Sequence, residues 1–372
     1  MFVVIKIRKR TVVKIIAVIL IGILCIMVIN SADANFLSIF SGVDQNINEL
    51  INDIILMRNK AILDGDIESL KILYNLKTVY GTWAYEHQVK KINYLQNWAE
   101  KQGIKFTAID ANITVRKVDP TNNGYTLNFS VFTKYTYVYI NDLNTKNYFK
   151  MGTYHSMDII ENGDYQLIDR EWYTDPFADS SDLNKLKTEQ ITNYILSGKP
   201  RDFTELNERR QGALDYADKY CGGSVSETVK FIYNNKYKNY NYSGGDCANF
   251  ASQVLHEGGK FKKNYTWGYQ KEGSKAWVNA DALKQYLLYS GRASLVAQGS
   301  YTKVLKASYL LQPGDIIAYG KKGEVKHVSI VTGADSKGYT LVNCHNADRF
   351  RVPWDLGWGD EDITFWLIHV HY

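Results

Sequence analysis

A cysteine at the expected start of a helix is the residue best placed for nucleophilic chemistry in this chain. Cys247 follows the flexible stretch Ser243-Gly244-Gly245 and Asp246, which is a favourable N-cap residue. Residues 250–255 have helical apolar spacing, and Gly258-Gly259 predicts the C-terminal end of the helix. The unpaired N–H groups and the dipole at such a start favour an anion. They are therefore expected to lower the pKa of the thiol and to face an oxyanion.

A histidine on a later strand is the candidate base for this thiol. The alternation that begins at His327 predicts a strand, and the polar residues 333–338 predict a turn into an antiparallel return strand. Pairing of Thr332 with Thr340 would place His327 and His345 on the same face. A cysteine–histidine pair needs a third polar group to orient the base, and we predict His345 for that role.

Further residues are candidates with weaker support. Asn346 and Asp348 lie just past the return strand and are weaker candidates for orienting the base. Asn343 would replace His345 as the orienting group if the register differed by two residues. Trp277 lies near polar turns and is a candidate for lining a substrate groove, although a tryptophan is more often part of the core. The spacing of cysteines and histidines matches no zinc signature, so we predict neither a metal nor a cofactor.

The first 34 residues have the pattern of an export signal. Basic residues precede an apolar run at 15–29, and Ala32-Asp33-Ala34 offers the small residues that a signal peptidase needs. The run is shorter than the roughly 20 residues of a spanning helix, so we expect cleavage after Ala34, with an uncleaved membrane anchor as the alternative. We predict a secreted or cell-envelope-associated protein.

The net charge gives no indication of a nucleic-acid partner. The formal charge is +5, from 44 basic and 39 acidic residues. The first 34 residues contain five of these basic residues and one of the acidic ones, so the remaining chain is close to neutral. The basic balance therefore belongs to the export signal.

The periodicity of apolar residues divides the rest of the chain into two domains. Apolar residues recur with the period of a helix in residues 35–100. In residues 105–172 they recur at every second position, as in a strand. Helices followed by antiparallel strands indicate an α+β fold, and the order resembles the curved-sheet cone of cystatin-like folds. We expect this first domain at 35–175, a linker with one short helix at 176–203, and a second domain at 204–372.

Three cysteines lie beyond the export signal, and an odd number leaves at least one unpaired thiol. A catalytic Cys247 accounts for it. Cys221 and Cys344 are left as a candidate pair, and alternation places Cys344 on the strand face away from the active site. We predict two free, mostly buried thiols in preference to a disulfide.

The second domain resembles a known family in several ordered blocks. Residues 246–259 closely resemble the putative amidase domain of Gram-positive bacteria, a relative of the CHAP and NlpC-like enzymes with a papain-like fold. The blocks at 274–277, 314–317, 327–331 and 345–348 match in the same order. The resemblance implies Cys247 and His327 as the catalytic pair, with a polar third residue near His345.

The resemblance also suggests where a second oxyanion donor would stand. Papain relatives have a glutamine six residues before the cysteine, and this chain has Asn241 there. NlpC-like enzymes often use an upstream tyrosine, for which Tyr240 or Tyr242 would serve.

The function expected from these residues is hydrolysis of amide bonds by an exported cysteine amidase or peptidase. The resemblance makes peptidoglycan the expected substrate, with a peptide as the broader class and the cell envelope as the partner. Two alternatives remain: an acyl-transferring, transglutaminase-like enzyme that keeps the same pair, and a non-catalytic module that binds the cell envelope.

Overall fold

The computed structural model describes residues 46–163, 165–177, 183, 186–222, 232–358 and 362–372. The expected export signal lies outside these residues. None of the helices in the described ranges has both the length and the hydropathy needed to cross a membrane. The chain divides into a smaller unit that ends at Asp53 and a larger unit that begins at Ile54. Of the smaller unit the structure describes residues 46–53, which are helical.

The first half of the larger unit is a long helix with an antiparallel sheet. After helical residues 54–64, its elements are η1 (Glu68–Leu73), α2 (Val79–Gln102), β1 (Ile104–Thr121), β2 (Gly124–Tyr139), β3 (Asp142–Asn162) and β4 (Tyr165–Tyr173). The predicted order of helices before strands is confirmed. Within residues 35–100, whose period predicted helices, residues 68–73 form the short 3₁₀ helix η1 and no α-helix.

Local sequence explains the ends of α2 and the first hairpin. Thr78 caps the start of α2 by accepting a hydrogen bond from the N–H of Gly81 (3.1 Å). Gly103 ends the helix with a φ of 66°, a conformation that glycine adopts without steric cost. The turn between β1 and β2 lies at Asn122-Asn123, and Thr121 pairs with Gly124 across it.

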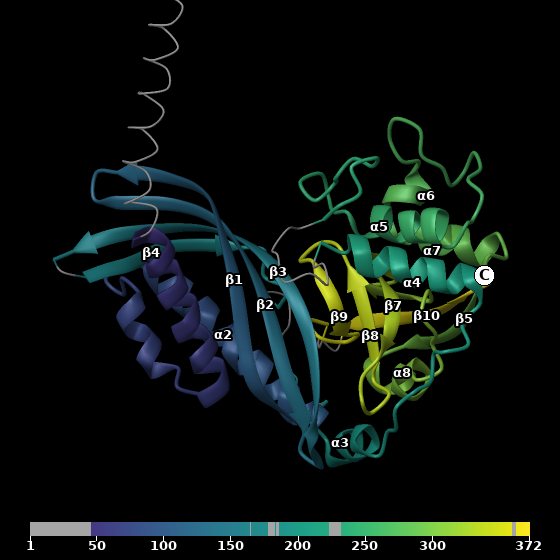
Figure 1. The fold of residues 1–372 in the computed structure, drawn as a ribbon, viewed down its shortest axis with the longest axis horizontal. Coiled ribbons are helices and arrows are strands. Elements are labelled where there is room, and N and C mark those ends of the chain that lie inside the picture. The colour runs from purple at the N-terminus through teal and green to yellow at the C-terminus, as the bar shows by residue number, and fades with distance from the viewer. Residues whose placement is uncertain (1–45, 164, 178–182, 184–185, 223–231, 359–361) are drawn as a thin grey trace, which may run out of the picture. The chain divides into compact units, whose positions relative to one another are not determined.

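The second half carries the candidate catalytic residues. Its helices are α3 (Glu189–Leu196), α4 (Glu208–Tyr220), α5 (Cys247–Gln253), α6 (Lys275–Val278), α7 (Ala280–Tyr289) and α8 (Tyr301–Ser308), with the π-helical turn η2 (Val254–Gly258) after α5. Its strands are β5 (Ala293–Gly299), β6 (Ile316–Lys321), β7 (Glu324–Ala334), β8 (Thr340–Cys344), β9 (Arg349–Pro353) and β10 (Ile363–Val370). Figure 1 shows α4, α5 and α7 on one face of this sheet and α8 on the other.

One large open antiparallel sheet contains all ten strands of the described residues. The order is β1-β2-β3-β9-β8-β7-β6-β10-β5, with β4 also paired to β3. The two halves join where Lys150 pairs with Phe350 and Met151 with Arg349. The fold is therefore α+β, and the end of β9 that carries Arg349 lies directly against the sheet of the first half.

Candidate functional site

Cys247 is the first residue of α5, as the sequence predicted, and 5% of its surface is exposed. The N–H of Phe250 donates to the Asp246 carbonyl (2.9 Å) and closes the first turn, so the preceding N–H groups lie outside the helical ladder. Asp246 is the N-cap residue of α5, as predicted, but its side chain makes no capping hydrogen bond. Its Oδ1 accepts hydrogen bonds from the N–H of Tyr240 (2.9 Å) and from the Asn249 side chain (2.8 Å) instead.

Burial keeps the Cys247 thiol protonated. Loss of hydration raises the pKa of the thiol to about 12, although the backbones of Val328 and Ala248, within hydrogen-bonding reach of the sulfur, act in the opposite direction. The lowered pKa that we predicted from the helix start is therefore wrong for this structure, because desolvation outweighs the helix N–H groups. Val328 directly follows His327, so the sulfur lies near the backbone of β7. Neighbouring residues of a strand point to opposite faces, and among the described residues no hydrogen bond joins the Cys247 sulfur to Nε2 of His327.

His327 is buried on β7 with an uncharged ring. Burial lowers the pKa of His327 to about 3, and the positive charge of Arg349 adds to this effect. The ring is stacked with Trp358 (centroids 5.3 Å apart) and tilted against Tyr319 (5.6 Å). Its Nε2 is buried and has no hydrogen-bond partner among the described residues. A neutral imidazole with an unused nitrogen can accept a proton.

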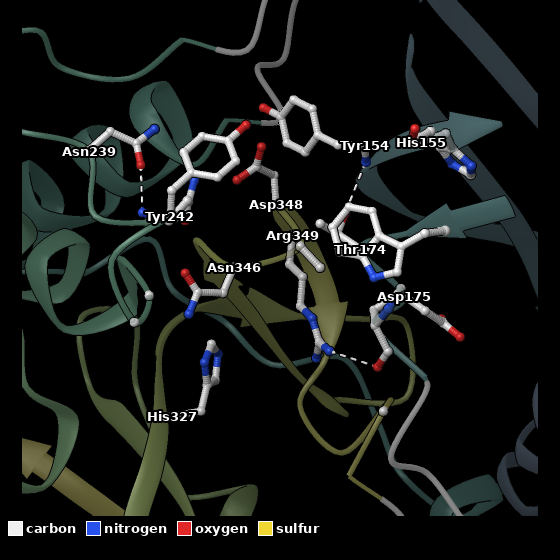
Figure 2. A pocket seen from close by; sticks show the side chains of 18 of the residues that line it. Tyr154, His155, Thr174, Asp175, Asn239, Tyr242, His327, Asn346, Asp348 and Arg349 are labelled. Atoms are coloured by element: carbon white, nitrogen blue, oxygen red, sulfur yellow. Dashed lines mark hydrogen bonds between the residues drawn. The ribbon is translucent and has the colours of Figure 1, made fainter. Parts of the chain in front are cut away.

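His327 opens onto a cavity of about 740 Å³ that both halves of the sheet help to line. Figure 2 shows side chains from the first half, such as Tyr154 and Asp175, around the same space as His327 and Arg349. Gly245, two residues before Cys247, also lines it. The cavity has the volume of a small-ligand site and reaches the segment that leads into the candidate nucleophile.

The register between β7 and β8 differs from the predicted one. Thr340 pairs with Ala334 and not with Thr332, and an irregularity precedes the pairing of Val331 with Val342. A shift of one residue turns every following side chain to the other face of the strand. The bulge could not be read from the alternation of apolar residues, because both faces of β7 and β8 are buried.

His345 therefore faces α5 and does not contact His327. Its Nδ1 lies 2.5 Å from Oδ2 of Asp246, its Nε2 lies 2.7 Å from the carbonyl oxygen of Tyr220, and its ring stacks on Phe250 (4.2 Å). Both ring nitrogens have partners, so the prediction that His345 orients His327 is wrong. His345 instead fixes the residue that precedes the candidate nucleophile.

Asn343, the predicted substitute, is also occupied elsewhere. Its Oδ1 accepts from the Thr332 hydroxyl (3.0 Å) and from the N–H of Arg351 (2.7 Å). Its Nδ2 donates to the Ala217 carbonyl (3.2 Å) and to the Asp218 carboxylate (2.9 Å). Its hydrogen bonds connect β8 to β7, β9 and α4, so its predicted role beside His327 is wrong.

The three candidate oxyanion residues occupy different positions. The Tyr240 hydroxyl accepts a hydrogen bond from the N–H of Gly273 (3.2 Å), and Tyr240 does not line the cavity. Asn241 and Tyr242 do line it. The Asn241 amide donates to the Tyr233 hydroxyl (3.2 Å), and its Oδ1 is buried without a partner among the described residues. No observation assigns any of the three to an oxyanion.

Trp277 is a core residue, and the prediction that it lines a groove is wrong. It is fully buried, and its indole N–H donates to Oδ1 of Asn249 (2.9 Å). Its ring lies against Trp267 (centroids 4.8 Å apart) and Tyr237 (5.8 Å). Trp277 therefore packs in the core against α5 and is hydrogen-bonded to it through Asn249.

Cys221 and Cys344 are buried and form no disulfide among the described residues, as predicted. Cys344, however, does not face away from the candidate base. It interacts with the Ser329 side chain, two residues along β7 from His327. The same bulge that redirected His345 accounts for this difference.

Within the described ranges, no cluster of histidine, cysteine and acidic side chains could hold a metal ion. The sequence patterns did not predict Arg349 as a site residue, although it lines the same cavity as His327. Its only signal was its place directly after the block 345–348. Arginine at a strand start has no distinctive spacing, and only tertiary packing shows that it is buried.

Comparison with known proteins supports the family resemblance for the second half. Residues 207–368 match the family model described as a putative amidase domain. The resemblance identified from the sequence is confirmed for these residues, and the match indicates amide hydrolysis as their class of activity. No solved structure matches the chain significantly.

Two curated proteins of Bacillus subtilis (strain 168) are similar to parts of the chain. Uncharacterized protein YhbB is 30% identical over 191 residues, which cover 46% of this chain and 54% of that protein. Uncharacterized protein YjcM is 32% identical over 154 residues, covering 38% of this chain and 31% of that protein. The chain thus spans about half of the first relative and a third of the second.

Proposed function

We propose that the chain is a cysteine amidase in which Cys247 is the nucleophile and His327 the general base. The observation that carries this proposal is the position of Cys247 in the first turn of α5, with its buried thiol near the backbone of Val328, the residue that follows His327. The unpartnered Nε2 of His327 and the adjoining cavity supply a proton acceptor and room for a substrate. A thiol at a helix start and an imidazole on the adjacent strand are the arrangement expected of a papain-like enzyme.

Proton transfer in this pair would accompany the attack on the amide. Because the pKa of the thiol lies near 12 and that of the imidazole near 3, both groups are neutral at rest. His327 would accept the thiol proton as the sulfur bonds to the carbonyl carbon. The free N–H groups at the start of α5 would stabilise the oxyanion. His327 would then return the proton to the leaving amine, and water would hydrolyse the thioester.

The proposed substrate is an amide bond of peptidoglycan, reached by export through the segment at 1–34. This substrate rests on the resemblance to cell-wall enzymes. Transfer of the acyl group to an amine acceptor is the alternative outcome of the same thioester, and the two are separated by whether new carboxylates or new amides appear.

Single substitutions of the proposed catalytic residues and of a control cysteine test the proposal. Purified peptidoglycan is digested with the wild type, Cys247→Ala, His327→Gln and Cys344→Ser, and new amino groups are counted. Loss of the nucleophile should lower the rate by about a million-fold if the pair acts as a unit. Cys344→Ser removes a thiol of similar burial and serves as the matched control. Full activity of Cys247→Ala would refute the assignment of the nucleophile. If the wild type cleaved simple peptides but not peptidoglycan, only the proposed substrate would be refuted.

A further inference from the structure

Arg349 differs from the other buried cations of this protein. Five lysine or arginine side chains of the described residues are buried, and four of them pair with a carboxylate. These pairs are Arg58–Glu171, Lys101–Asp355, Arg210–Asp315 and Lys284–Asp281. Arg349, 3% exposed, donates instead to the Leu356 carbonyl (2.7 Å) and, over a longer distance, to the Pro176 carbonyl (3.4 Å). Its Nε has no partner among the described residues.

A buried guanidinium without a carboxylate partner lowers the stability of the folded protein. Removing a cation from water carries a large desolvation penalty, and two neutral carbonyls compensate for only part of it. Arginine has five N–H donors in a planar fork, so donors remain for a further acceptor. Arg349 lines the cavity, and its charge reaches His327, whose pKa it helps to lower. An anion that entered the cavity would meet this charge beside the candidate base.

We propose that Arg349 binds a carboxylate of the substrate, so that the preferred substrates are amides carrying a negative charge close to the bond that reacts. This inference rests on the proposed function, because it takes the cavity beside His327 as the substrate site. Charge-assisted hydrogen bonds from arginine to a carboxylate are short and directional, and they would also orient the amide. A carboxylate bound in the cavity would give Arg349 an ion pair of the kind that the other four buried cations already have.

Two alkylating reagents of similar size test this inference without requiring the natural substrate. Iodoacetate carries the carboxylate, and iodoacetamide is its neutral counterpart. The rate at which each labels Cys247 is measured by mass spectrometry, and their ratio is compared with the ratio for the urea-unfolded chain. We expect the folded wild type to favour iodoacetate, and Arg349→Gln to lower the ratio by about tenfold. Arg349→Lys, which keeps the charge but loses the planar fork, should give an intermediate ratio.

Lys326→Gln is the matched control. It removes one positive charge at the cavity, but Lys326 is solvent-exposed and already paired with Glu324 (2.7 Å). Its ratio should stay close to that of the wild type. If Arg349→Gln does not fold, Arg349→Lys decides, and a ratio equal to that of the wild type overturns the inference. Cys247 labelling no faster than Cys221 and Cys344 with either reagent would refute the proposed function. Fast labelling with an unchanged ratio in the Arg349 variants would refute only the role of Arg349.

Discussion

The Nδ1 atom of His345 lies 2.5 Å from Oδ2 of Asp246, which connects the end of β8 to the residue before the candidate nucleophile. Both side chains are almost completely buried. Oδ1 of the same carboxylate accepts two more hydrogen bonds, from Tyr240 and Asn249. One carboxylate therefore holds the approach to α5, the first turn of α5 and the strand end together.

Asp246→Asn should destabilise the protein, because the amide replaces an acceptor oxygen of this network with a donor. Loss of hydrogen bonds to a buried charged group predicts a decrease of about 3 kcal/mol in the free energy of unfolding, measured in urea. Asp215→Asn, on the exposed face of α4, removes a carboxylate that contacts only Gln211 among the described residues and is the control. A change below about 0.5 kcal/mol in Asp246→Asn would contradict the importance of this contact.

The two glycines before Asp246 allow a matched comparison. Both have positive φ, 99° for Gly244 and 112° for Gly245. A Cβ at Gly244 would meet nothing within 4 Å, whereas a Cβ at Gly245 would lie 2.3 Å from the Asn346 amide nitrogen. The Oδ1 of Asn346 accepts a hydrogen bond from the N–H of Asp246 (2.6 Å). Substitution at Gly245 should therefore disturb the start of α5 as well as straining the backbone.

We expect Gly244→Ala to cost about 1 kcal/mol through its backbone conformation alone, and Gly245→Ala to cost at least about 1 kcal/mol more. The free energy of unfolding and the rate of Cys247 alkylation measure the two effects. Equal values for the two variants would show that Asn346 can move aside without consequence.

The depressed pKa of His327 predicts a pH dependence of stability with a definite sign. The folded pKa of about 3 lies below the unfolded value of about 6.5, so the unfolded state binds more protons between these values. The contribution of His327 to stability is therefore present above pH 6.5 and is lost as the pH falls towards 3. The steepest slope is about 1.4 kcal/mol per pH unit.

Comparison of the wild type with His327→Gln isolates this effect. Asp348, whose pKa burial raises to about 6, acts in the opposite direction over part of the same range, so the wild-type curve alone is ambiguous. The stability difference between the two proteins should change between pH 7 and pH 4, with the variant losing less. Parallel curves would mean that His327 becomes protonated while the protein stays folded.

The buried ion pair between Lys101 of α2 and Asp355 connects the two halves of the sheet. The same carboxylate also accepts from Trp98 (3.1 Å) and from the Tyr339 hydroxyl (2.7 Å). Lys101→Met leaves this carboxylate without its cation, and we expect a loss of about 3–5 kcal/mol in the free energy of unfolding.

Lys187→Met is the control for Lys101→Met, because its partner Glu100 is largely exposed. An exposed pair of this kind contributes about 0–1 kcal/mol. Urea unfolding of both variants measures the difference. Similar small losses would indicate that the pairing between Asp355 and its neutral donors is sufficient without the lysine.

Patterns local in sequence were enough to predict much of this protein. The period of apolar residues predicted α2, the long strands and the strand that begins near His327, because each element buries one face and repeats with its own geometry. Gly103 and Gly258-Gly259 ended their helices where positive φ or close packing required glycine. The same local pattern placed Cys247 at the start of α5.

Only the tertiary structure decided which side chains meet. A single irregularity between β7 and β8 moved His345 from His327 to Asp246, since one added residue inverts the faces of a strand. Burial reversed the expected direction of the thiol pKa, because hydration depends on everything packed around the sulfur and not on the helix start alone. The position of Arg349 beside His327 likewise follows from β9 lying against β3, a contact between residues about 200 positions apart that no local pattern encodes.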